Sequence, residues 1–407
     1  MIVSSGLALF VMGLAVASTN TVTDSFHWTG HWIACPDAPV RDAAVFHFRK
    51  HLTLENVPPH FIVRVSADSQ FLLYVNQQRV GSGPARSDLA HWRFETYDLA
   101  PFLRAGKNVL AATVWNFGEH SAIAQMSDRA GFLLQGDTAA EQPADSNDTW
   151  EVEQEKGIAP IAPSDLPPHT YFAAEPSERM DAPAFDWQWN QASSASTNSG
   201  WKKAVSLGKA TSRGQTFPST NWELVPDPLP PMAMELASVG RVVRAAGIDL
   251  PSAFPDKPFQ VPAHSTASIL IDTSHLTTAY PELTVTGGAA SHIRITYAEA
   301  LYDEKGEKGN RNEIAGKHIV GLHDEFLPDG PTRTFVPLTW KTWRFLQLDI
   351  TTADEPLRVE RLRSWFTAFP FEQRGHFDSD DSSLAKIWET GWRTARLDAH
   401  DTYMDTP

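Results

Sequence analysis

Short stretches of alternating apolar and polar residues occur in two long parts of the chain, residues 24–136 and 232–370. Such alternation is typical of β-strands that bury one face. In the N-terminal part it occurs at residues 61–65 and 71–75, and an apolar run follows at residues 109–115. The stretch at residues 71–75 is followed by Asn76-Gln77-Gln78-Arg79, a candidate hairpin turn. Further along, Asp98 can cap a short turn that begins at Leu99. Residues 24–136 are therefore predicted to form a β-sandwich.

The alternation weakens over residues 137–231, where Ala, Ser, Thr, Asn and Pro dominate. Four isolated tryptophans nevertheless occur here, at Trp187, Trp189, Trp201 and Trp222. Disordered segments are poor in tryptophan. We therefore expect an irregular linker or extension that packs back onto the first sandwich.

Alternation resumes over residues 232–370, with predicted strands at 268–272, 283–286, 293–297 and 345–350. Several short strands separated by turns predict a second β-sandwich. Residues 300–330 interrupt it with a long, charged, glycine-bearing excursion. Loops of this length in compact domains are commonly functional or mobile.

The period changes near the end of the chain. After a cluster of Asp and Ser at residues 378–383, apolar residues recur at spacings of three and four: Leu384, Ile387, Trp388, Trp392 and Ala395. This pattern predicts an amphipathic helix with an N-terminal cap. The sequence ends soon afterwards, at Pro407, so residues 371–407 are expected to begin a helical domain that this chain does not complete.

Composition narrows the range of partners. A net charge of −15 disfavours a nucleic-acid backbone or an anionic membrane as a partner, and leaves a neutral ligand unaffected. The one cysteine, Cys35, excludes an internal disulfide framework. The oligomeric state is not predicted.

The N-terminus has features of an export signal. Residues 6–17 form an apolar run too short to span a bilayer, and Ala15-Val16-Ala17 is a small-x-small cleavage pattern. No Lys or Arg precedes the run, so the positively charged segment that usually begins a signal peptide is missing. We expect a signal peptide over residues 1–17 and a periplasmic or secreted protein. The alternatives are a mis-assigned start and a buried strand.

Three different groups of motifs occur along the chain. The first comprises Ala67-Asp68-Ser69, residues 73–76, 80–84, 97–99 and 106–110. The second comprises residues 297–301, 308–312 and Trp340-Lys341-Thr342-Trp343-Arg344. The third runs from Phe377 through Gly391-Trp392-Arg393-Thr394 to Asp405-Thr406-Pro407. Together they resemble bacterial α-L-rhamnosidases of glycoside hydrolase family 78.

The resemblance implies a mainly β fold of two β-sandwich (jelly-roll-like) domains, followed by the first helix of an incomplete (α/α)6 barrel. It also implies an inverting glycosidase acting on terminal α-L-rhamnosides, with a rhamnose-containing glycoside or polysaccharide as partner. In such an enzyme one carboxylic acid protonates the leaving oxygen, and a carboxylate about 6.5–9.5 Å away activates water.

The family pattern places both catalytic glutamates after a motif like Asp405-Thr406-Pro407, so no catalytic residue is assigned within this chain. Asp405 matches an aspartate that contacts hydroxyls of the bound sugar. The middle position of the motif, often Cys in relatives, is Thr406 here. The chain is thus expected to be an N-terminal fragment that is inactive alone.

Other candidate residues have two interpretations each. Asn310 and Arg311 are sugar-facing donors if their loop reaches over the active-site mouth, and solvated surface residues otherwise. Trp388 and Trp392 stack on sugar or, as their i, i+4 spacing favours, pack in a core. Asp68, Asn76 and Asp98 carry oxygen atoms suited to calcium, but their spacing fits no recognised loop.

His275, His318 and His323 lack the close pairing of a zinc site, so no metal and no cofactor are predicted. Glycine-rich phosphate loops and the Gly-x-Ser-x-Gly elbow of serine hydrolases do not occur in the sequence. The competing hypothesis is a stand-alone carbohydrate-binding β-sandwich protein without catalysis. A relative acting on another sugar is a third, because sandwich domains do not specify a substrate.

Overall fold

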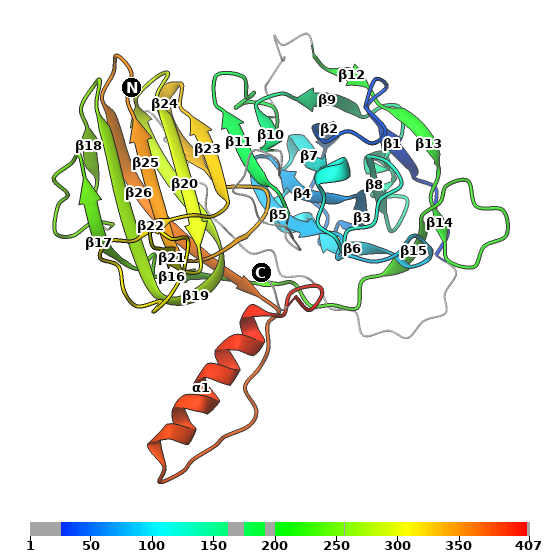
Figure 1. Ribbon diagram of the computed structural model, residues 1–407. Helices are drawn as coiled ribbons and strands as arrows, with labels where there is room; N and C mark the ends of the chain where they lie inside the picture. The colour runs from blue at the N-terminus through cyan, green and yellow to red at the C-terminus, as the bar shows by residue number, and fades with distance from the viewer. Residues whose placement is uncertain (1–25, 162–174, 192–199, 256, 405–407) are drawn as a thin grey trace. The chain divides into compact units, whose positions relative to one another are not determined.

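The computed structural model describes residues 26–161, 175–191, 200–255 and 257–404, and strands dominate it (Figure 1). The predicted mainly β fold class is confirmed, and the described residues contain one α-helix. The chain forms two compact units. Unit 1 consists of Met1–Lys156 and Asp186–Pro230, and unit 2 of Gly157–Phe185 and Pro231–Pro407. Within residues 137–231, therefore, Gly157–Phe185 belongs to unit 2 and the rest, apart from Pro231, to unit 1.

Unit 1 contains a seven-stranded and a six-stranded sheet. In spatial order the first is β13 (Val205–Lys209), β1 (His31–Ala34), β8 (Gly131–Gly136), β3 (Ile62–Asp68), β6 (Trp92–Asp98), β15 (Glu223–Pro226) and β14 (Thr211–Ser212). The second is β12 (Lys202–Lys203), β9 (Glu151–Glu155), β2 (Ala44–Leu54), β7 (Gly106–Asn116), β4 (Gln70–Val75) and β5 (Gln78–Gly83).

Two apolar clusters cover the two faces of the seven-stranded sheet. Phe132 of β8 packs with residues of the six-stranded sheet such as Phe46 and Phe71, which forms the core between the sheets. The next residue, Leu133, belongs to a second cluster with Trp92 and Trp222. Successive side chains of a strand point to opposite faces, so β8 is buried on both sides.

The predicted hairpin turn is confirmed. Strands β4 and β5 pair in antiparallel register from Phe71↔Gly83 to Val75↔Gln78, with Asn76 and Gln77 between them. Both turn residues have positive φ, 51° and 72°. Such a turn matches the twist of the flanking strands, and asparagine tolerates it better than most residues. This explains why the turn forms without glycine.

Unit 2 is built on an eleven-stranded sheet. Its main path is β10 (Ile158–Ile161), β11 (Ser177–Asp181), β23 (His323–Leu327), β20 (His292–Ala298), β25 (Lys341–Thr351), β19 (Thr266–Gly287), β26 (Leu357–Ala368) and β16 (Ala233–Ala237). Off this path lie β17 (Arg241–Ala246), β18 (Phe259–Val261) and β24 (Gly330–Phe335). A separate two-stranded sheet joins β21 (Leu301–Tyr302) to β22 (His318–Ile319).

Strand β19, 22 residues long, organises unit 2. Its first part pairs with β17 and β25, and its later part pairs with β24 and β26. The register with β25 shifts between Asp272 and Thr277, so the strand is irregular at its middle. A shift of this kind bends a strand and increases its twist, which lets β19 serve both parts of the sheet.

Four buried polar side chains join the strands at one side of this sheet. The Lys341 ammonium lies 3.7 Å from Glu178 Oε1 and 3.6 Å from Asp324 Oδ1. The Tyr297 hydroxyl donates to Asp324 Oδ2 at 2.8 Å. Burial raises the pKa of Glu178 to about 7, although the Lys341 charge opposes this. These contacts link β11, β20, β23 and β25.

Helix α1 (Ser382–Leu397) follows β26. The Asp381 side chain accepts a hydrogen bond from the Ser383 amide, which satisfies a free donor of the first turn, as the Asp/Ser cluster predicted. After the helix the chain is tied to the residue that follows β26, because the Phe369 amide donates to Ala399 O at 2.7 Å. The His400 ring stacks on Trp340 at 4.0 Å.

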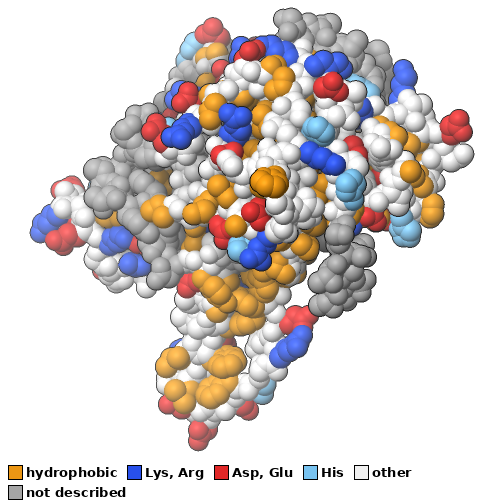
Figure 2. All heavy atoms as spheres, turned by 90° about the vertical axis from the view of Figure 1, so that its right-hand side faces the viewer, with side chains coloured by type: hydrophobic (Ala, Val, Ile, Leu, Met, Phe, Trp, Pro, Cys, Tyr) orange, Lys and Arg blue, Asp and Glu red, His pale blue; other side chains and the backbone are white. Residues whose placement is uncertain are grey.

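The other end of α1 carries an exposed apolar surface. Leu384, Ile387 and Trp388 are 41%, 66% and 42% exposed, and hydrophobic side chains gather on the projecting helix at the bottom of Figure 2. Trp388 stacks on Phe377, with the ring centroids 5.7 Å apart. Residues predicted to form one face of a helix do so, and in this structure most of that face is open.

No helix among the described residues combines the length and the apolar character needed to cross a membrane.

Candidate functional site

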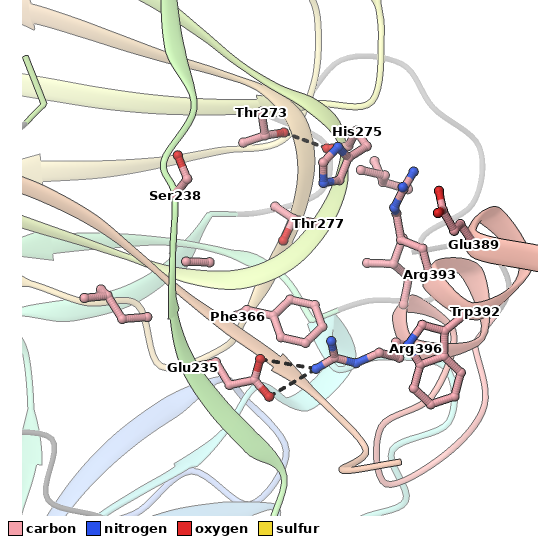
Figure 3. A pocket seen from close by; sticks show the side chains of 14 residues that line it. Glu235, Ser238, Thr273, His275, Thr277, Phe366, Glu389, Trp392, Arg393 and Arg396 are labelled. Atoms are coloured by element: carbon pink, nitrogen blue, oxygen red, sulfur yellow. Dashed lines mark hydrogen bonds and ion pairs between the residues drawn. The ribbon is translucent and has the colours of Figure 1, made fainter. Parts of the chain in front are cut away.

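A pocket of about 510 Å³ opens in unit 2 between α1 and the strands β16, β19 and β26 (Figure 3). Its wall on one side comes from the C-terminal half of the helix. The opposite wall comes from Glu235–Ser238 at β16, from the irregular middle of β19, and from Phe366 of β26. Both walls belong to unit 2.

The helical wall consists of Glu389, Trp392, Arg393, Arg396 and Leu397. These positions are spaced by three and four, so they share one face of the helix. Arg396 is fixed across the pocket: its Nη2 donates to both carboxylate oxygens of Glu235, at 3.1 and 3.3 Å. Its guanidinium also lies over the Phe366 ring, 4.5 Å from the centroid. The ion pair therefore closes one end of the pocket.

The strand wall owes its shape to the irregularity of β19. The Thr273 hydroxyl donates to the carbonyls of His275 and Arg344, at 2.6 and 2.9 Å. Asp272 accepts from the Ser274 amide at 2.8 Å and from Arg344 Nε at 3.0 Å. These bonds hold the irregular segment in place, and Thr273, His275 and Thr277 line the pocket as a result.

The charges of the pocket are balanced. Two carboxylates, Glu235 and Glu389, and two guanidinium groups, Arg393 and Arg396, line it. Partial burial lowers the pKa of His275, and the charges of Arg393 and Arg344 lower it further. The imidazole is therefore neutral at pH 7, with one nitrogen that donates and one that accepts. Together these groups offer hydrogen bonds of both kinds to a polar ligand, without a net charge.

The residues predicted to bind sugar do not line this pocket. Asn310 and Arg311 are exposed on the segment between β21 and β22. Arg311 Nη1 lies 3.7 Å from Glu299 Oε2, and Asn310 O accepts from Lys317 Nζ at 2.7 Å. Asp405 lies outside the described residues. The proposed roles of all three stay predictions.

Sequence reasoning missed most of the pocket. Trp392 was considered for sugar stacking, and His275 was considered only as a zinc ligand, without the pairing that such a site needs. Glu235, Thr277 and Arg393 carried no recognised motif. The available signal was the single helical face shared by Glu389, Trp392, Arg393 and Arg396, which the apolar stripe obscured.

The oxygen-bearing residues considered for calcium are separate and already engaged. Asp68 is fully buried and accepts from the Asp128 amide, the Asn116 side chain and Trp222 Nε1, at 2.7, 3.1 and 3.0 Å. Asp98 Oδ1 accepts from the Phe61 and Ala100 amides, and Ala100 begins the short turn after Asp98. Across the described part of the chain, no group of three or more His, Cys, Asp or Glu is placed to hold a metal ion.

Comparison with known proteins gives a likeness by fold and none by sequence. No family model and no curated protein matches the chain. Among solved structures, the family GH78 rhamnosidase of Bacillus sp. GL1 covers 93% of this chain with a TM-score of 0.75 and 14% identity. The α-L-rhamnosidase of Aspergillus terreus also covers 93%, with a TM-score of 0.60 and 18% identity. That of Streptomyces avermitilis, complexed with L-rhamnose, covers 91%, with a TM-score of 0.58 and 17% identity.

The chain spans only part of these proteins: 59% of the Bacillus enzyme, 41% of the Aspergillus enzyme and 33% of the Streptomyces enzyme. At such low identity the likeness concerns the fold alone. The likeness nevertheless covers more than nine tenths of this chain, so it includes both units. The chain therefore has the fold of a part of α-L-rhamnosidases of glycoside hydrolase family 78.

Proposed function

We propose that this chain forms the β-domains and one barrel helix of an α-L-rhamnosidase-type inverting glycoside hydrolase that acts on terminal α-L-rhamnosides. The observation that carries the proposal is the fold likeness to α-L-rhamnosidases over 91–93% of the chain. The motif resemblance around residues 297–312 and 340–344 supports it independently.

The exposed face of α1 also supports the proposal. Burying a side chain such as Leu384, Ile387 or Trp388 stabilises a protein by about 1.5–3 kcal/mol. A helix that leaves three such residues 41–66% exposed is suited to packing against further helices. Neighbouring helices of an (α/α)6 barrel provide surfaces of this kind.

The proposed reaction needs two catalytic carboxyl groups, and neither is assigned to this chain. Inversion needs a carboxylic acid that protonates the glycosidic oxygen and a carboxylate that activates water from the opposite side of the sugar. In the family pattern the acid comes a few residues after the Asp-x-Pro motif, and the base lies much further along the barrel. Asp405 would contact hydroxyls of the sugar, and Asn310 and Arg311 would donate at the entrance. The chain alone is therefore expected not to hydrolyse glycosides.

The proposed setting is extracellular or periplasmic, with export directed by residues 1–17, which lie outside the described residues. A terminal rhamnosyl group is uncharged. The net charge of −15 therefore does not oppose its binding.

The experiment measures hydrolysis of an aryl α-L-rhamnoside by this chain and by the product of the longest open reading frame that contains it. We expect no turnover by the chain and turnover by the longer product, with β-L-rhamnose as the first anomer seen by NMR. Turnover by the purified chain would contradict the assignment of both carboxyl groups to other segments.

Absence of turnover in a folded longer product would overturn the proposed activity. Saturable sugar binding without turnover in that product would instead favour the stand-alone binding protein. First release of α-L-rhamnose would contradict inversion and leave the substrate class intact.

A further inference from the structure

The pocket beside α1 has the dimensions of a small-molecule site. Ligand pockets in proteins measure about 300–1,000 Å³ and combine apolar walls with a few convergent polar groups. This pocket measures about 510 Å³ and is walled by Trp392, Phe366 and Leu397. A single glycosyl residue fits a space of that size.

The polar groups that remain available lie at one end of the pocket. Arg396 and Glu235 satisfy each other at the other end. Among the described residues no ion pair joins Arg393 to a carboxylate, and in Figure 3 its guanidinium extends into the space between His275 and Glu389. A guanidinium offers several donors in a fixed plane, and a neutral imidazole offers one donor and one acceptor. Adjacent hydroxyl groups of a ligand would be recognised by such a pair.

The charges of the pocket determine the class of ligand. Glu389 and Arg393 balance each other in sign, as Glu235 and Arg396 do. An anionic ligand would meet Glu389, and a cationic ligand would meet Arg393, so each would bring an unfavourable contact. A neutral ligand rich in hydroxyl groups avoids both. The Trp392 indole adds a broad apolar surface with a polar edge, suited to a ring with one apolar face.

We propose that the pocket between α1 and the β16, β19 and β26 strands binds a neutral glycosyl residue, with Arg393 and His275 as hydrogen-bonding partners and Trp392 as the apolar wall. This site goes beyond the proposed hydrolysis. It belongs to the chain itself and does not depend on the catalytic carboxyl groups.

The test uses the full chain and three probes: methyl α-L-rhamnoside, methyl α-D-glucoside and D-glucuronate. Binding is followed by saturation-transfer difference NMR as each probe is titrated. We expect saturable binding of at least one neutral glycoside and no tighter binding of glucuronate. Arg393→Ala and His275→Ala should each weaken the binding, the former by about tenfold because a hydrogen bond from a charged group is lost.

Lys386→Ala is the matched control, because Lys386 is exposed on the same helix and does not line the pocket. It should leave the affinity unchanged. Both Arg393 and His275 are exposed, so their variants should fold, which circular dichroism checks. Lack of saturation by both neutral glycosides, tighter binding of glucuronate, or equal weakening by Lys386→Ala would each overturn the proposal.

Discussion

Tryptophan side chains differ in solvent exposure between unit 1 and α1. Trp32 and Trp222 are 0% and 1% exposed and stack at 4.2 Å between ring centroids. Trp388 is 42% exposed and has Phe377 as its aromatic neighbour. Trp32 lies in β1 and Trp388 in α1, whereas Trp222 directly precedes β15. A tryptophan in the sequence therefore indicates an apolar surface, and a second layer of structure decides whether that surface is buried.

The largest effect is expected for Trp222→Ala. The substitution removes a stacked indole from the core and also removes a hydrogen bond to buried Asp68. Large-to-small substitutions of this kind cost about 3–5 kcal/mol. The free energy of unfolding of unit 1, followed by urea titration with hydrogen exchange of its peptides, should fall by that amount. A loss below about 1 kcal/mol would show that the second cluster contributes little to unit 1.

Lys341→Met should have the next largest effect, in unit 2. It leaves Glu178 and Asp324 buried without their cation. Breaking a buried ion pair by removing one partner destabilises a protein by about 3 kcal/mol or more. Hydrogen exchange should accelerate in β11, β23 and β25. The matched control is Lys308→Met, which breaks the exposed pair with Glu299 and should change stability by less than about 1 kcal/mol. Equal effects of the two substitutions would contradict the buried network.

The acid stability of unit 2 should depend on Glu325. Partial burial favours its protonated form, but hydrogen bonds and charges from Arg179, Arg294 and His292 outweigh this and hold its pKa at about 2. A carboxyl group with a folded pKa below its ordinary value of 4.5 stabilises the fold above that pH. This stabilisation is lost as the pH falls from about 4.5 to 2. Glu325→Gln should flatten that part of the stability profile, measured by thermal melts, and an unchanged slope would contradict the assignment.

The smallest effect is expected for Trp388→Ser. Because this side chain is largely exposed, the free energy of unfolding should change by no more than about 0.5 kcal/mol. Binding of a hydrophobic dye to the chain should nevertheless decrease, since an apolar patch is removed. A loss of several kcal/mol would place Trp388 in a core and would remove the contrast with Trp222.

Much of the fold was predictable from local patterns. Strands β3, β4 and β20 were visible as alternation, and the Asp381 cap was visible as an Asp/Ser cluster before an apolar stripe. The Asn76-Gln77 turn was also predictable from its position between two strands. Pairing between distant segments was not. The parallel contact of β11 with β23, for instance, includes a buried hydrogen bond between residues 146 apart in sequence, which the Glu178 amide donates to Asp324 Oδ1.

The pocket was less predictable for the same reason. Its polar groups come from β16, β19 and α1, which are separated in sequence by long intervals and carry no shared motif. His275 lines it because β19 is irregular there, and an irregularity of this kind depends on contacts such as that between Asp272 and Arg344. Alternation within a strand does not reveal such contacts.

The length of β19 affects how cooperatively unit 2 unfolds. Strand β19 is hydrogen-bonded to β17, β24, β25 and β26. If any of these partners detached, part of the β19 backbone would lose its hydrogen bonds. Calorimetry of unit 2 should therefore give one melting endotherm for its main sheet, and single-molecule pulling should extend that sheet in one step.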